Sequence, residues 1–126
     1  MKVLVDTSVW VAHFKQRNQH LVGLLETGRV ICHPYVIAEV ACGTPPNRQL
    51  VLALLEELEF APVATVPELL GLIERRALYA RGCGFVDISL LAAALLDKHT
   101  LVWTLDKRLS ATAADLGLSY SPTVLS

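Results

Sequence analysis

Short apolar runs that end at a polar residue alternate along this chain with stretches of helical periodicity. Val3-Leu4-Val5 runs into Asp6, and Leu101-Val102-Trp103 runs into Thr104-Leu105-Asp106. Continuous apolar runs of this length are typical of buried strands. We therefore predict strands over residues 2–5, 30–32 and 101–103, and a final edge strand over residues 118–120.

The segments between these runs carry the marks of helices. Val51, Leu54, Leu55 and Leu58 recur at the spacing of an amphipathic helix. Thr65-x-x-Glu68 has the pattern of a capping box, and the apolar stripe that follows continues through Ala77 and Ala80 toward Gly82. We predict helices over residues 7–14, 34–42, 46–59, 65–81 and 86–98, with a short one after Asp106.

Strands that alternate with helices predict an α/β domain built on a parallel sheet. In such sheets ligands bind outside the carboxyl ends of the strands. Asp6 and Asp106 follow predicted strands directly, whereas Glu39 and Asp87 lie on helices that can cover the same edge. The pattern thus predicts a cluster of carboxylates at one edge of the sheet.

Each of these acids also has an ordinary structural interpretation. Asp6, Asp87 and Asp106 stand where helix caps are expected, and Glu39 can face solvent. If the acids converge, two carboxylates about 4 Å apart repel by roughly 4 kcal/mol at an effective dielectric constant of 20. A divalent cation relieves this repulsion, and all-oxygen ligands favour Mg²⁺ or Mn²⁺ over zinc.

Composition limits the classes of protein that the chain can represent. Its 126 residues, 53% of them hydrophobic, suit one domain over residues 1–126. The formal net charge of −1 excludes a strongly basic nucleic-acid coat, so a polyanion has to be bound locally. Three cysteines without a C-x-x-C pair favour neither a disulfide framework nor a zinc site. The longest apolar run is far below the roughly 20 residues that span a bilayer, and we expect a soluble, cytoplasmic protein.

Four motifs, taken in order, resemble those of the PIN-domain ribonucleases, and particularly the VapC-like toxins of bacterial toxin–antitoxin pairs. The resemblance covers nearly the whole chain. It rests on Val3-Leu4-Val5-Asp6-Thr7-Ser8, Ala38-Glu39-Val40, Asp87-Ile88-Ser89-Leu90-Leu91-Ala92-Ala93-Ala94 and Thr104-Leu105-Asp106-Lys107-Arg108-Leu109. Leu90 and Leu91, where many relatives are richer in alanine, and Leu109, where an aromatic residue is common, depart from the pattern without removing an acid.

The resemblance implies a three-layer α/β/α fold and a metal-dependent endoribonuclease. Asp6, Glu39, Asp87 and Asp106 would hold one or two Mg²⁺ or Mn²⁺ ions, which activate water for attack on an RNA phosphodiester. The products would carry a 5′-phosphate and a 3′-hydroxyl. The family further implies a homodimer and a small cognate antitoxin that places an amphipathic segment in a groove beside the active site.

Other polar residues near the acids are candidates for substrate binding or orientation. Thr7, Ser8 and Thr104 can orient the acids or bind water, and Arg81 and Lys107 can contact the phosphates of RNA. Arg75 and Arg76 are better explained as a solvated helix face.

Two alternatives remain open on sequence alone. One is an aspartate-based phosphatase that uses Asp6, although Ser8 stands where a second aspartate is usual in the haloacid-dehalogenase-like phosphatases. The other is a PIN-like module that binds RNA or a protein partner without cutting.

Overall fold

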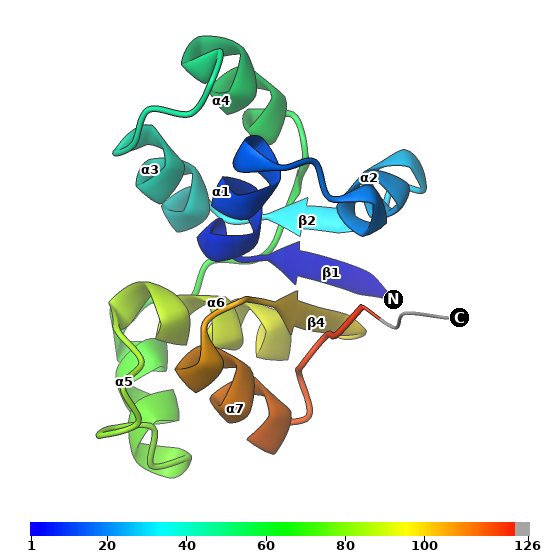
Figure 1. Ribbon diagram of the computed structural model, residues 1–126. Helices are drawn as coiled ribbons and strands as arrows, with labels where there is room; N and C mark the ends of the chain where they lie inside the picture. Colours follow the sequence, from blue (N-terminus) through cyan, green and yellow to red (C-terminus); the bar gives the residue numbers. More distant parts are fainter. Residues whose placement is uncertain (123–126) are drawn as a thin grey trace.

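The computed structural model describes residues 1–122, and in this range a four-stranded parallel sheet forms the centre of the molecule (Figure 1). The strands lie in the order β3-β2-β1-β4, and their pairing fixes β1 between β2 and β4, with Val3 beside Val30 and Val5 beside Trp103. Their bounds are Lys2–Val5 (β1), Val30–Cys32 (β2), Glu59–Phe60 (β3) and Thr100–Trp103 (β4).

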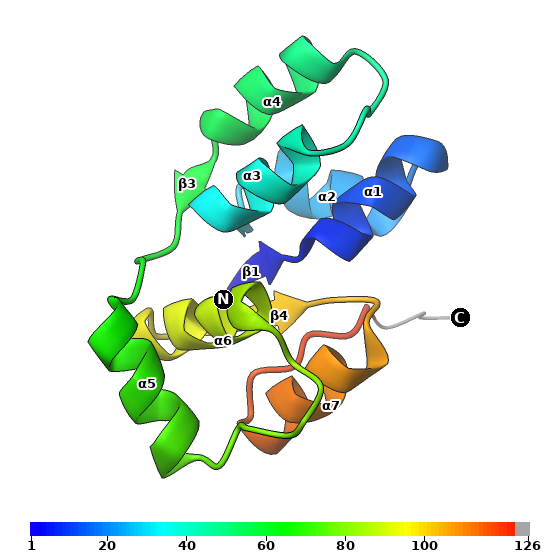
Figure 2. The same cartoon turned by 90° about the vertical axis from the view of Figure 1, so that its left-hand side faces the viewer.

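Helices cover both faces of the sheet, as Figures 1 and 2 show. The chain passes from β1 to β2 to β3 in one direction along the sheet and then returns past β1 to β4. Because crossovers between parallel strands are right-handed, a connection that runs in the opposite direction along the sheet places its helices on the opposite face. This arrangement confirms the predicted three-layer α/β/α fold. One layer holds α1 (Thr7–Lys15), α2 (Gln19–Glu26), α3 (Pro34–Ala41) and α4 (Arg48–Glu56), and the other holds α5 (Val66–Arg75), α6 (Phe85–Leu96) and α7 (Lys107–Asp115).

The core is centred on β1 and α6. Val3, Leu4 and Val5 are fully buried, because β1 is central in the sheet and covered on both faces. Every residue of α6 from Ile88 to Ala94 is buried, so this helix is apolar on all sides and not on one stripe. Within residues 1–122, every helix is too short or too polar to cross a membrane.

The predicted helix over residues 46–59 is too long at its C-terminal end. It ends at Glu56, and Glu59–Phe60 forms β3, which pairs with Ile31 and Cys32 of β2. Pairing with an available parallel neighbour outweighs the local helical periodicity here.

The predicted helix over residues 65–81 is also too long, although its capping box is confirmed. Ala77 adopts a positive φ of 50°, and the N–H of Leu78 donates to the carbonyl of Ile73 at 2.9 Å. These are the features of a Schellman motif, which ends α5 at Arg75. Burial of Leu78, which is 2% exposed, accompanies the turn in place of the usual glycine signal.

The predicted edge strand over residues 118–120 is reduced to one bridge. Ser119 pairs with Val102, and the flanking residues Leu118 and Tyr120 hydrogen-bond to the backbone of Val102. This segment extends the sheet beyond β4 by a single residue pair.

Candidate active site

The carboxyl ends of β1 and β4 form the point where the topology of the sheet changes direction. From β1 the chain passes to α1 on one face, and from the adjacent β4 it passes to α7 on the other (Figure 1). Ligands of open α/β sheets bind in the crevice that such a divergence leaves. Asp6 follows β1 here, and Thr104 and Asp106 follow β4.

Asp6 is 6% exposed and is held by hydroxyl groups on both sides of this crevice. Its Oδ2 accepts hydrogen bonds from Ser8 Oγ at 2.7 Å and from Thr104 Oγ1 at 2.7 Å. Asp6 occupies the N-cap position of α1 but its side chain makes no capping bond. The capping interpretation of Asp6 is therefore wrong, and its carboxylate is oriented instead by a network that links β1 to β4.

The two hydroxyl groups also fix the loop after β4. Thr104 Oγ1 accepts from the N–H of Asp106 at 3.0 Å, and Ser8 Oγ accepts from the N–H of Leu105 at 3.0 Å. Ser8 and Thr104 thus position Asp6 and the backbone that carries Asp106 at the same time.

Replacing Thr104 by valine is expected to destabilise the fold by about 1–3 kcal/mol, because the buried Asp6 carboxylate then keeps only its bond from Ser8 and the Asp106 N–H loses its partner. Equilibrium unfolding in urea measures the loss. Thr104→Ser keeps the hydroxyl and is expected to lose much less; equal losses in both variants would contradict this role of the hydroxyl.

Asp106 and Asp87 do act as helix caps, with one oxygen each. Asp106 Oδ1 accepts from the N–H of Leu109 at 2.9 Å, and Asp87 Oδ2 accepts from the N–H of Gly84 at 3.0 Å. For both residues the structure gives no hydrogen-bond partner within residues 1–122 to the second carboxylate oxygen. The capping role and a role in the crevice are thus compatible.

The pKa of Asp87 is sensitive to the other two aspartates. Burial raises the pKa of the Asp87 carboxyl, the hydrogen bond from Gly84 lowers it, and the negative charges of Asp6 and Asp106 raise it further. Burial is the largest of these causes, and the negative charges of Asp6 and Asp106 add to it.

Glu39 lies at the margin of this group. It is exposed on α3, and its Oε1 accepts from Thr7 Oγ1 at 2.6 Å. Since Thr7 follows Asp6 in the chain, this bond ties α3 to the start of α1. The predicted fourth acid is thus connected to the centre through one hydroxyl group.

The donor chemistry of this centre fits a hard divalent cation. All four candidates are carboxylates, and each uses one oxygen in the hydrogen bonds above. The ion pairs found among residues 1–122 are Lys2–Glu59 and Arg81–Asp115, so no basic side chain of this range is paired with the four acids. In the same range, no three Asp, Glu, His or Cys side chains stand close enough to enclose an ion without movement.

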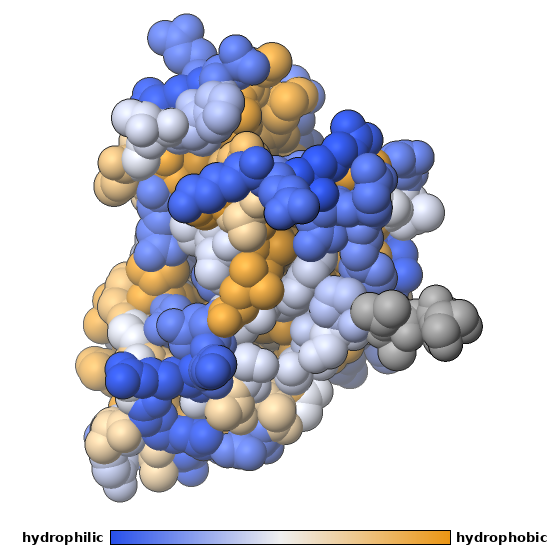
Figure 3. All heavy atoms as spheres, in the orientation of Figure 1, coloured by the Kyte–Doolittle hydropathy of each residue, from blue (hydrophilic) through white to orange (hydrophobic). Residues whose placement is uncertain are grey.

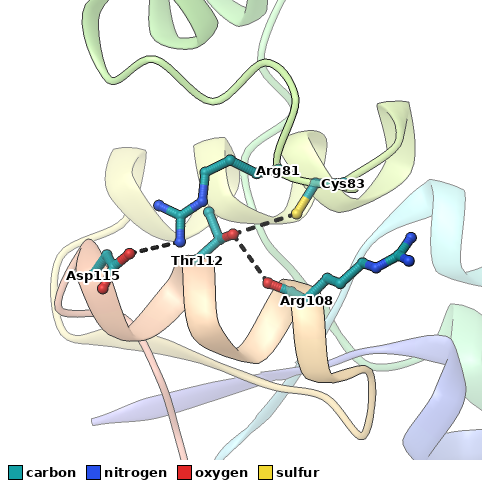
Figure 4. Close-up of polar contacts among 5 residues, drawn as sticks. All are labelled: Arg81, Cys83, Arg108, Thr112 and Asp115. Carbon is teal, nitrogen blue, oxygen red and sulfur yellow. Dashed lines mark hydrogen bonds and ion pairs between the residues drawn. The ribbon is translucent and has the colours of Figure 1, made fainter.

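Arg81, a predicted substrate-binding residue, forms an ion pair with Asp115. Its guanidinium pairs with Asp115 at 2.6 Å, at the C-terminal end of α7, whereas the acids lie at the N-terminal end (Figure 4). The predicted phosphate contact of Arg81 is therefore not supported by this geometry. Lys107 is exposed and is the first residue of α7, beside Asp106.

Two aromatic side chains near the acids were not predicted to belong to the site. Tyr35 lies one helical turn before Glu39, and Phe85 lies two residues before Asp87. Their ring centroids are 5.5 Å apart. Proximity in sequence to an acidic motif is the signal that could have identified them.

Comparison with known proteins agrees with this arrangement. Residues 3–115 match the family model of the PIN domain. The chain belongs to the PIN domain family. This PIN domain is 43% identical over 122 residues to Ribonuclease VapC32 of Mycobacterium tuberculosis, from strains CDC 1551 / Oshkosh and ATCC 25618 / H37Rv; the match covers 97% of this chain and 98% of that protein. The family predicted from the four motifs is thereby confirmed, and all four acids lie in or beside the elements of the PIN domain that meet at the carboxyl edge.

Proposed function

We propose that this PIN domain is an endoribonuclease, the toxin of a toxin–antitoxin pair, and that Asp6, Asp87 and Asp106, with Glu39 beside them, form its metal-dependent centre. The observation that carries the proposal is the hydrogen-bond network through Thr104, which joins Asp6 to the backbone of Asp106 at the switch point of the sheet, with no basic side chain paired to either acid in residues 1–122. The relative named as a ribonuclease supports the same activity.

The side chains of the centre have separable tasks. Asp6, whose Oδ2 is fixed by Ser8 and Thr104, would offer its second oxygen to the metal. Asp87 and Asp106 would complete the ligand set with the oxygens that their capping bonds leave. A bound Mg²⁺ or Mn²⁺ supplies an acidified water and offsets charge on the phosphate. Lys107 is the cation best placed in sequence to contact a neighbouring phosphate.

Removal of divalent metal tests the proposed reaction. We expect the purified protein to cleave a structured RNA in Mg²⁺ or Mn²⁺, to lose this activity in EDTA and to regain it when metal is restored. End mapping should find 5′-phosphate and 3′-hydroxyl termini. Cleavage that persists in EDTA would contradict the metal centre. RNA binding without cleavage would favour the silent module, and release of inorganic phosphate from a monoester would favour the phosphatase.

The cognate antitoxin has a candidate docking groove in the helical layer that holds α1 to α4. An apolar groove of about 550 Å³ lies between α1, α2 and α4, and its lining includes Trp10, Phe14, Leu25 and Leu54. Leu54 is 54% exposed although it is apolar. These features suit the apolar face of an amphipathic helix.

Leu54→Arg is expected to weaken antitoxin binding at least about tenfold, because a buried unpaired charge at an interface costs over 1.4 kcal/mol. Leu50→Arg is the matched control, since Leu50 is 58% exposed on the same helix but does not line the groove. Titration calorimetry with the cognate antitoxin measures both. An equal effect of the two substitutions would argue against the groove.

The homodimer and the cytoplasmic location that the resemblance implies stay predictions. Sedimentation equilibrium of the free protein tests the former, and fractionation of the source cell tests the latter.

A further inference from the structure

A pair of aromatic rings spans the carboxyl edge of the sheet beside the acids. Tyr35 is the second residue of α3 and Phe85 is the first residue of α6. These helices cover opposite faces of the sheet (Figure 1), yet the two rings lie 5.5 Å apart at an interplanar angle of 35°. The two rings therefore meet beyond the end of the sheet, at the same edge as the crevice.

Each ring of the pair is close in sequence to one of the acids. Tyr35 precedes Glu39 by four residues, which places both on one face of α3. Phe85 shares the first turn of α6 with Asp87. A group stacked on the rings would thus lie at the N-terminal ends of α3 and α6, the edge at which the acids are proposed to act.

A buried histidine holds the pair in place from below. His33 is fully buried, its ring lies 4.9 Å from that of Tyr35, and its Nδ1 accepts from the backbone N–H of Tyr35 at 3.1 Å. The three rings form a continuous series from the core to the surface. Phe85, at the outer end of this series, therefore packs against Tyr35, which itself packs against the buried ring of His33.

The outer ring remains open to solvent. Phe85 is 56% exposed, with Tyr35 against one side. Figure 3 shows hydrophobic residues on the side of the molecule toward which the strand arrows of Figure 1 point. A large apolar ring left exposed beside a polar centre is the arrangement that a stacking ligand requires.

Because the centre is acidic, contacts that do not depend on charge are important for binding RNA. The edge carries four acids, and the whole chain has a formal net charge of −1, so electrostatic attraction to a polyanion is weak. Stacking of a base on an aromatic ring contributes about 1–3 kcal/mol without any charge. Only an unpaired base can expose its face in this way.

We propose that Phe85, supported by Tyr35, stacks against an unpaired base of the RNA beside the scissile phosphate. This inference rests on the proposed ribonuclease function. Phe85 is then a substrate-binding residue that acts before and during cleavage, and Tyr35 and His33 position it.

Binding is tested first, without reference to cleavage. A single-stranded RNA oligomer that carries 2-aminopurine at successive positions is titrated with the wild-type protein in EDTA. We expect quenching of the fluorescence at one or two positions, its retention in Phe85→Trp, and its loss in Phe85→Leu. Tyr79→Leu is the control, because Tyr79 is equally exposed, at 61%, in the loop after α5. Absence of quenching in the wild type, or its survival in Phe85→Leu, overturns the proposal.

Cleavage provides the second arm. In an RNA whose cut site has been mapped, an abasic residue beside that site should lower kcat/KM of the wild type by about 5- to 100-fold, mainly through KM. The same abasic substitution should have little further effect on Phe85→Leu. Equal sensitivity of both proteins overturns the stacking role while the ribonuclease stands. If neither protein cleaves RNA in Mg²⁺ or Mn²⁺, the proposed function fails, and the fluorescence arm still decides the stacking.

Discussion

Replacing Asp6 with asparagine is expected to lower the rate of RNA cleavage at least about a hundredfold, since loss of even an outer partner of a metal ligand typically costs roughly 10- to 100-fold. The amide oxygen can still accept from Ser8 and Thr104, as Asp6 Oδ2 does. The amide nitrogen then takes the place of the oxygen that faces the crevice, and the negative charge is lost. Single-turnover cleavage of a labelled RNA with saturating Mg²⁺ measures the effect.

Glu74→Gln is the matched control for this experiment. Glu74 is exposed near the end of α5, its side chain makes no hydrogen bond or ion pair within residues 1–122, and the same loss of one charge there should leave the rate unchanged. Circular dichroism has to show that Asp6→Asn remains folded. A folded variant that cleaves within threefold of the wild type would remove Asp6 from the centre.

Asp87→Asn is expected to abolish cleavage while it stabilises the fold. Burial and the charges of Asp6 and Asp106 raise the pKa of Asp87, so the folded protein retains this proton to a higher pH than the unfolded chain does. The contribution of Asp87 to stability therefore declines as the pH rises through its folded-state pKa, because the carboxylate that forms is repelled by Asp6 and Asp106. Asparagine removes the charge and can still accept from the N–H of Gly84.

Thermal unfolding measures this gain in the absence of divalent metal. We expect the midpoint of Asp87→Asn to exceed that of the wild type by about 2–4 °C at neutral pH, and the difference to vanish in acid, where the wild-type carboxyl is protonated. Added Mg²⁺ should stabilise the wild type and have a smaller effect on the variant. A variant less stable than the wild type at neutral pH would show that the cap matters more than the repulsion.

The parts of the fold that could be predicted from sequence are those encoded locally. β1 and β4 are continuous apolar runs, and the capping box at Thr65 and the cap at Asp106 are short-range hydrogen bonds between neighbours in sequence. The order of such local motifs along the chain then indicates the family, and the family indicates which acids belong to one site. These features led to the sheet, the layers and the proposed acids.

The features that sequence could not provide depend on contacts between distant segments. β3 is a strand only because β2 offers it an edge, and α5 ends where the burial of Leu78 completes a turn. The distinction between Asp6 and the two capping aspartates likewise depends on Thr104, which lies 98 residues away. Periodicity within one segment holds no information about such partners.

The bond between Thr104 and Asp6 also has a consequence for the biosynthesis of the protein. Because it joins positions 98 residues apart, the centre cannot assemble until the segment that carries β4 has left the ribosome. Contacts of such long range form late, since the entropy of closing the intervening loop has to be overcome first. A nascent or prematurely terminated chain that lacks β4 thus also lacks the hydroxyl group of Thr104 that orients Asp6.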